Sequence, residues 1–247
     1  MRSLLTLCGC LIAFPATAIV VASSSFQADG LSISSAAGTI SFGVSANPMQ
    51  VGASAFDSDG NGSAQFFQIP PDALAPASAA TPNASASGSI DLSPLVLKAT
   101  SSAQSDGTSA AAASAYAQWS TSLTVARNPG DLGDSTVVTL SMLVSGLLSG
   151  SADSFGSFAT EGFALVQLDG GTLFSLFPPA LAGGPDFADA QSFSETLGAK
   201  FDAFFDQTYE ILVFVDAETS TQRVPEPATP VLVAAGLVML SRRRRFQ

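Results

Sequence analysis

Apolar and polar residues alternate along most of the chain between residues 19 and 223. In the stretch STVVTLSMLVS, Val138, Leu140, Met142 and Val144 fall on one face, and Thr and Ser dominate the other. This period of two is typical of strands that are buried on one side. The same pattern gives three further apolar sets: Ile40, Phe42 and Val44; Met49, Val51, Ala53 and Ala55; Tyr209, Ile211, Val213 and Val215.

In two stretches the secondary structure has to be predicted from residue types as well as from the alternation. FALVQLDGGTLFSLF predicts a hairpin, because Asp169-Gly170-Gly171 supplies residues that tolerate positive φ. The Ala-rich SAAAASAYAQWS also suits a helix, since alanine is the best helix former. We favour a strand, because one alternating face continues through Ala117, Trp119, Thr121, Leu123 and Val125.

These strands predict an all-β body over residues 19–223. The chain has 18 Phe residues, and we expect those at strand positions to fill the space between two sheets about 10 Å apart. The prediction is therefore a β-sandwich of jelly-roll or immunoglobulin-like type. The Pro-, Ala- and Ser-rich residues 70–85 predict a long loop, or a linker between two β lobes.

The first 18 residues, MRSLLTLCGCLIAFPATA, have the three parts of a secretory signal peptide. Arg2 supplies the positive charge, Leu4–Phe14 the apolar helix, and Ala16-Thr17-Ala18 the small-x-small pattern that signal peptidase accepts. We expect export by the Sec machinery and cleavage after Ala18.

Charge and cysteine content narrow the choice of partners. Both cysteines, Cys8 and Cys10, lie in the signal segment, so no disulfide is expected in the mature body. That body carries four cationic and nineteen acidic side chains, a net charge of −15. Such a surface repels phosphate backbones and anionic headgroups, which excludes nucleic acid as an expected partner.

The absence of histidine narrows the chemistry further. It removes Ser-His and Cys-His nucleophile pairs, histidine bases and nearly all zinc and copper sites. Carboxylate chemistry of the glycosidase type is what survives. We therefore expect no enzyme, with a carboxylate-dependent, polysaccharide-active enzyme as the third alternative.

One short motif suggests a metal. DSDGNG places oxygen ligands Asp57, Asp59 and Asn61 at alternate positions and resembles the first half of an EF-hand-type calcium loop. Position twelve of such a loop is Gln68 rather than glutamate. The alternative is a polar hairpin loop between strands 49–56 and 63–69, and we favour it.

The C-terminal residues have a layout of their own. The apolar segment 228–240 has 13 residues, so as a helix it spans about 20 Å of a hydrocarbon core about 30 Å thick. Arg242, Arg243, Arg244 and Arg245 follow it and are expected to stay cytoplasmic. A segment this short predicts a temporary transmembrane tether with the body outside.

Residues 224–247 resemble the PEP-CTERM sorting signal. The resemblance rests on Pro225-Glu226-Pro227, the apolar segment and the terminal Arg cluster, in that order. It implies recognition and tail removal by an exosortase, and a Gram-negative source that makes exopolysaccharide or a biofilm matrix. The alternative is a small tail anchor that is never cut.

The function expected from the sequence is that of an exported, non-enzymatic surface or extracellular-matrix protein. It would be tethered transiently in the inner membrane and then released to the cell surface. A calcium-assisted carbohydrate-binding module is the alternative, and exopolysaccharide is a candidate partner of either.

Overall fold

A computed structural model describes residues 19–45, 49–69, 76–92, 94–106 and 109–223, and every regular element in these ranges is a β-strand. The strands are β1 (Ile19–Ser35), β2 (Thr39–Gly43), β3 (Met49–Asp57), β4 (Gly62–Ile69), β5 (Ala77–Ala80), β6 (Ala84–Leu92), β7 (Leu95–Asp106), β8 (Ala110–Ala126), β9 (Ser135–Ser151), β10 (Gly156–Leu168), β11 (Gly171–Leu176), β12 (Leu181–Gly183), β13 (Ala188–Phe204) and β14 (Thr208–Arg223).

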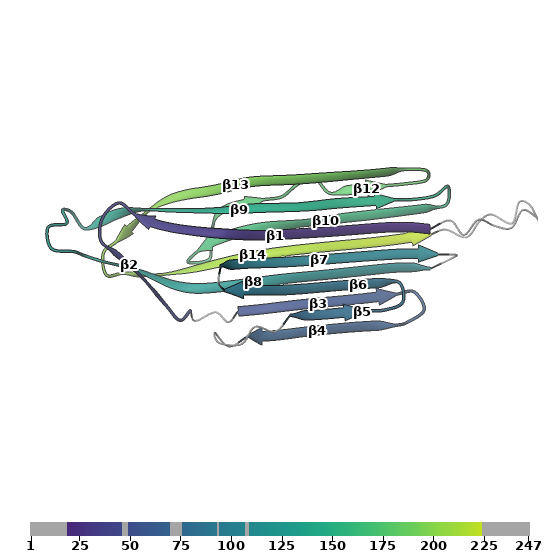
Figure 1. The fold of residues 1–247 in the computed structure, drawn as a ribbon, viewed down its shortest axis with the longest axis horizontal. Coiled ribbons are helices and arrows are strands. Elements are labelled where there is room, and N and C mark those ends of the chain that lie inside the picture. Colours follow the sequence, from purple (N-terminus) through teal and green to yellow (C-terminus); the bar gives the residue numbers. More distant parts are fainter. Residues whose placement is uncertain (1–18, 46–48, 70–75, 93, 107–108, 224–247) are drawn as a thin grey trace, which may run out of the picture.

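The strands form two antiparallel sheets (Figure 1). Sheet A has the order β13-β9-β1-β7-β6-β5, and sheet B has the order β11-β10-β14-β8-β3-β4, with β12 beside β10 and β2 beside β8. The sheets pack face to face, since β1 contacts β10 and β14, and β7 contacts β14 and β8. The all-β class and the two packed sheets agree with the expected sandwich. The predicted signal helix and transmembrane helix lie outside the described residues.

Small side chains fill the space between the sheets. The buried alanines are Ala22, Ala28, Ala77, Ala79, Ala84, Ala86, Ala99, Ala103 and Ala203 on sheet A, and Ala53, Ala55, Ala111, Ala113, Ala115, Ala117, Ala164 and Ala217 on sheet B. At Gly88 of β6, an added Cβ would lie 2.4 Å from the carbonyl oxygen of Tyr116 in the opposite sheet. The expectation that Phe fills this space is wrong for most positions: among the described Phe residues, Phe26 and Phe158 are the fully buried ones.

Most of the predicted strand faces are confirmed. Val138, Leu140, Met142 and Val144 of β9 are buried, and the sets on β3 and β14 are likewise buried: Met49, Val51, Ala53 and Ala55; Tyr209, Ile211, Val213 and Val215. The Ala-rich stretch is strand β8, and the β10–β11 hairpin turns at Asp169 and Gly170, both with positive φ.

Two expectations need correction. In β2 Ile40 packs against the core, but Phe42 and, just beyond the strand, Val44 are largely exposed, because β2 is a short strand beside one end of β8. The predicted loop or linker 70–85 contains β5 and the start of β6. Buried alanines at 77, 79 and 84 place these strand residues in sheet A, so residues 77–80 and 84–85 belong to the sandwich and not to a loop or linker.

Candidate functional site

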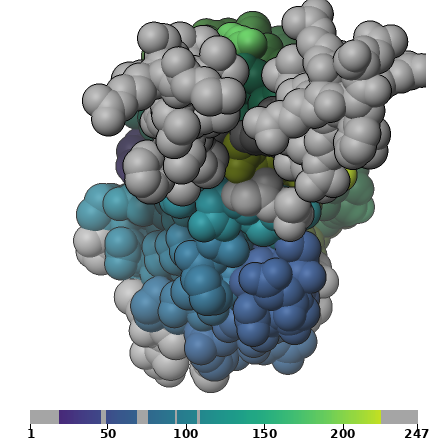
Figure 2. Space-filling model, turned by 90° about the vertical axis from the view of Figure 1, so that its right-hand side faces the viewer, coloured from purple at the N-terminus to yellow at the C-terminus, as the bar shows by residue number. Residues whose placement is uncertain are grey.

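The first and last strands meet at one end of the sandwich. β1 begins and β14 ends at the same side of Figure 1, and Figure 2 views this end with the yellow residues of β14 between green strands above and blue strands below. β1 is central in sheet A and β14 is central in sheet B. The predicted sorting motif, Arg cluster and signal-peptidase residues Ala16 and Ala18 all lie outside the described residues.

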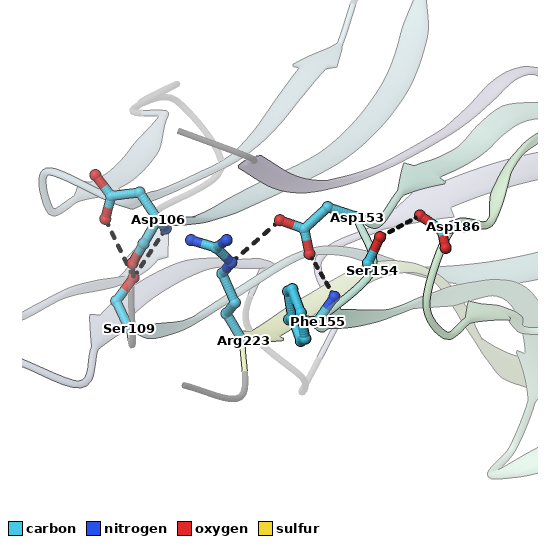
Figure 3. Close-up of polar contacts among 7 residues, drawn as sticks. All are labelled: Asp106, Ser109, Asp153, Ser154, Phe155, Asp186 and Arg223. Carbon is cyan, nitrogen blue, oxygen red and sulfur yellow. Dashed lines mark hydrogen bonds and ion pairs between the residues drawn. The ribbon is translucent and has the colours of Figure 1, made fainter. Parts of the chain in front are cut away.

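A buried ion pair holds the last residue of β14 (Figure 3). Arg223 Nε lies 3.1 Å from Asp153 Oδ2, and the two side chains are 7% and 14% exposed. Charge rather than hydrogen-bond alignment holds the contact, because neither atom makes a well-aligned hydrogen bond. Breaking such a pair by removing one partner costs about 3–5 kcal/mol, since it leaves a buried charge unpaired.

Neighbouring loops support the ion pair. The backbone N–H of Phe155 donates to Asp153 Oδ1 at 2.9 Å, and Ser154 Oγ donates to Asp186 Oδ1 at 2.8 Å. The backbone N–H of Arg223 donates to the carbonyl of Ser109 at 3.3 Å. The end of β14 is therefore tied to the loops that precede β8, β10 and β13.

The DSDGNG motif forms the loop of the β3–β4 hairpin. The carboxylate of Asp57 accepts hydrogen bonds from the backbone N–H of Asp59 and of Asn61, each at 3.1 Å, and from Asn61 Nδ2. Asp57 thus closes the loop with its own oxygens, as the hairpin interpretation expects. Among the described residues no group of three or more acidic side chains is arranged to hold a metal. Calcium binding by Asp57, Asp59 and Asn61 stays a prediction.

Five aromatic rings cross the outer face of sheet B. This aromatic band consists of Phe66 on β4, Tyr116 on β8, Phe214 on β14, Phe163 on β10 and Phe177 just after β11. Successive ring centroids are 6.4, 5.7, 5.4 and 5.1 Å apart, and successive planes are within 26° of parallel. Nearly parallel rings this far apart are offset, so each leaves part of its face uncovered by its neighbour.

A glycine allows the band to cross β3. Gly52 lies between Tyr116 and Phe66 in the strand register. A Cβ at Gly52 would lie 2.3 Å from Tyr116 Cε1 and 2.7 Å from Phe66 Cδ1. The rings of Tyr116 and Phe66 therefore stack over the backbone of Gly52. A residue with a side chain at this position would push the two rings apart.

Three carboxylates lie beside the band. This carboxylate cluster consists of Glu161 on β10 and Asp216 and Glu218 on β14, and Asp216 is paired with Phe163 and Tyr116 in the strand register. Burial, together with the negative charges of Glu218 and Glu161, raises the pKa of Asp216 to about 7, and burial is the largest of these causes. Such a shift is typical of a carboxyl that lacks a compensating cation.

The cluster and the band line a groove on the same face. One cavity of about 360 Å³ is bounded by Phe163, Phe177, Asp216, Glu161 and Glu218. A second, of about 270 Å³, shares the two glutamates and has a floor of Ala and Ser side chains. It shares part of that floor with a third cavity of about 550 Å³ near the β3–β4 hairpin loop.

Sequence reasoning missed this face, although a signal was present. Tyr116 lies between two buried alanines and Phe214 between two buried valines. Each aromatic residue is therefore out of phase with the apolar face of its strand. That phase predicts an outward ring, but strand order is needed to bring the five rings together.

We also compared the chain with known proteins. No family model, curated protein or solved structure matches this chain. Within the described part of the chain, no helix has the length and apolarity to cross a bilayer.

Proposed function

We propose that this chain is an exported, non-enzymatic surface or extracellular-matrix protein that an exosortase sorts and processes through its PEP-CTERM-like tail. The observation that carries the proposal is the order of three parts: Pro225-Glu226-Pro227, the apolar segment 228–240 and Arg242–Arg245. Export would follow the Sec signal peptide 1–18, and the body would then be tethered transiently in the inner membrane.

The described sheets are compatible with this proposal. The part of β1 that the structure describes starts at Ile19, and the described part of β14 ends at Arg223. Cuts after Ala18 and beyond Arg223 would therefore remove none of the described strand residues. The buried Arg223–Asp153 pair would keep the end of β14 in place after the tail is gone.

Mass spectrometry of the exported protein tests the proposal. In a host with an exosortase, the surface form should start at Ile19 and lack the arginine-rich C-terminus. Replacing Pro225 and Pro227 with Ala should leave the chain intact and membrane-bound, whereas Pro230→Ala, a proline outside the motif, should be processed like the parent. A surface form that keeps Arg242–Arg245 would overturn the proposal in favour of an uncut tail anchor.

A carbohydrate-binding module is the second candidate function, and the aromatic band favours it. The calcium-assisted form of this proposal also needs Asp57, Asp59 and Asn61 to hold the ion. A glycan array with and without calcium separates the forms, because calcium-assisted binding should disappear in chelator. The third candidate, a carboxylate-dependent enzyme, requires turnover of a polysaccharide and would draw on the carboxylate cluster. The finer topology, jelly-roll or immunoglobulin-like, stays a prediction.

A further inference from the structure

We infer that the aromatic band and the carboxylate cluster bind an extended polysaccharide that carries free amino groups, of the β-linked glucosamine type. The site is the outer face of sheet B between Phe66 and Phe177. The inference goes beyond the proposed function, since it concerns the body and does not depend on how the tail is processed.

The rings provide a platform for sugars. Phe66 and Phe177, at the two ends of the band, are each 62% exposed, and the three rings between them are half-buried. Sugar rings present C–H groups that pack on aromatic faces, and the offset leaves such faces open. Because the band spans sheet B from β4 to β11, its open faces suit a chain of sugars better than a single small molecule.

The carboxylates select the charge of the ligand. In the described part of the chain the two ion pairs are Arg127–Asp134 and Arg223–Asp153, so no cationic side chain pairs with Glu161, Asp216 or Glu218. An ammonium group between them would gain both carboxylate contacts and attraction to the faces of Phe163 and Phe177. An acidic polysaccharide would meet only repulsion there.

The cavity places these groups within reach of one ligand unit. Phe163 and Phe177 bound the same 360 Å³ space as Asp216, Glu161 and Glu218. The groove then continues over a floor that includes Ala112, Ser114, Ala159 and Ser220. These small side chains leave open space beside the band, next to the ammonium site.

Charge argues against a second copy of this chain as the occupant. Two copies joined through this face would bring two carboxylate clusters together, on bodies that each carry a net charge of −15. Uncompensated like charges in an interface cost several kcal/mol, which opposes such a dimer. A cationic polymer removes the same repulsion.

Isothermal titration of the full chain in detergent tests the inference. The probes are a β-1,4-linked glucosamine hexamer, its fully N-acetylated counterpart, a polygalacturonate, hexalysine and spermine. We expect saturable binding of the glucosamine hexamer that weakens with added salt. The N-acetylated hexamer should bind at least about tenfold more weakly because it lacks the ammonium groups. The acidic polymer should not bind.

The variants are made at exposed residues, so that a change in binding does not come from a loss of folding. Phe66→Ala and Phe177→Ala should each weaken binding of the glucosamine hexamer about fivefold, and Glu218→Gln about threefold. The matched controls are Phe204→Ala and Glu195→Gln on β13 of sheet A, which should bind like the parent. Both control residues are exposed and lie on another sheet.

Each alternative outcome overturns the inference. These outcomes are no saturable binding of the glucosamine hexamer, equal binding of its N-acetylated form, and unchanged affinity in the band variants. Hexalysine or spermine binding as tightly as the glucosamine hexamer would show a general cation site instead. None of these outcomes bears on tail removal, so the two proposals fail independently.

Discussion

The two faces of sheet B use alanine and phenylalanine in opposite ways. The inner face is built largely from Ala and Val, as on β8, where Ala111, Ala113, Ala115 and Ala117 are all buried. The outer face of the same sheet carries the aromatic band, whose five rings face away from the core. In most domains the large apolar side chains are the ones inside.

The close approach of the sheets explains the inner face. Thr160 Oγ1 of sheet B donates to the carbonyl of Ser23 in sheet A at 3.1 Å, and Ser24 Oγ of sheet A donates to the carbonyl of Glu161 at 2.9 Å. Side chains of one sheet thus reach the backbone of the other, which leaves little room for large rings. The outward-facing rings therefore do not contribute to the core. Exposed aromatic patches of this kind are typical of binding surfaces.

The outer face of sheet A carries different side chains from the outer face of sheet B. Its side chains are largely hydroxyls that pair across strands, as in Ser23–Ser149, Ser85–Ser102 and Ser87–Thr100, each with oxygens 2.7 Å apart. These hydroxyls bond to one another. Hydroxyls and some exposed aliphatic side chains, such as Leu143 and Leu147, therefore cover the outer face of sheet A, whereas stacked rings cover that of sheet B. This difference is the reason why we place the proposed recognition surface on sheet B.

The largest effect is expected from enlarging an inner alanine. Ala115→Val should destabilise the fold by about 1–3 kcal/mol, because the two added methyl groups enter a space bounded by the opposite sheet. Ala112→Val, on the outer face of the same strand, should change stability by less than about 0.5 kcal/mol. Guanidinium unfolding measures both variants. Equal effects would mean that the sheets are not closely packed.

A smaller effect is expected at Gly52. Gly52→Ala should cost about 1 kcal/mol, because its Cβ pushes Tyr116 and Phe66 apart and removes their stacking. In a Tyr116→Ala background the same change should become neutral or stabilising, since alanine is otherwise favoured over glycine in a strand. A double-mutant cycle measures this change of sign. A constant cost in both backgrounds would show that the ring contact is not the cause.

The smallest effect is a pH dependence at Asp216. Its pKa is raised from 3.8 to about 7 in the fold, so the folded state holds this proton more tightly than the unfolded state. Stability therefore falls as pH rises from about 4 to about 7 and is unaffected by this group below that window. Asp216→Asn should remove this slope and gain on the parent by roughly 0.5–1 kcal/mol at pH 8, after allowance for solvent screening.

Glu218→Gln provides the control for this slope. It removes one of the negative charges that raise the pKa of Asp216, so the upper end of the pH window should move down without disappearing. Urea unfolding across pH 4–8 gives both profiles. A slope that Asp216→Asn leaves unchanged would assign the effect to other carboxyls.

The sequence predicts strands and buried faces well, because both are local properties. The alternation that contains Leu140 and Met142 specifies which side of β9 is buried, and Asp169-Gly170 specifies a turn. The prediction that Phe residues fill the space between the sheets was wrong for most of them. It rested on the number of Phe residues, whereas the position of each residue in the alternation of its strand decides whether its ring points inward or outward. Phe214 was in a strand whose inner face was correctly predicted, and its outward direction follows from that same phase.

The groove is not a local property. Phe66, Tyr116 and Phe163 are far apart in sequence, and they meet because β4, β8 and β10 belong to one sheet in a particular order. Nothing in the alternation of a single strand specifies its neighbours. The raised pKa of Asp216 has the same origin, since it depends on Glu161 of the adjacent strand β10.

The central position of β14 has a mechanical consequence. Its partners β10 and β8 run beside it through long antiparallel registers, from Gly156 to Leu168 and from Ala110 to Thr124. The backbone hydrogen bonds of antiparallel strands lie across the strand direction. A pull along the axis of β14 from Arg223 would load these bonds in shear, together rather than one after another. A pulling force applied at Arg223 would therefore be shared along the whole length of β14.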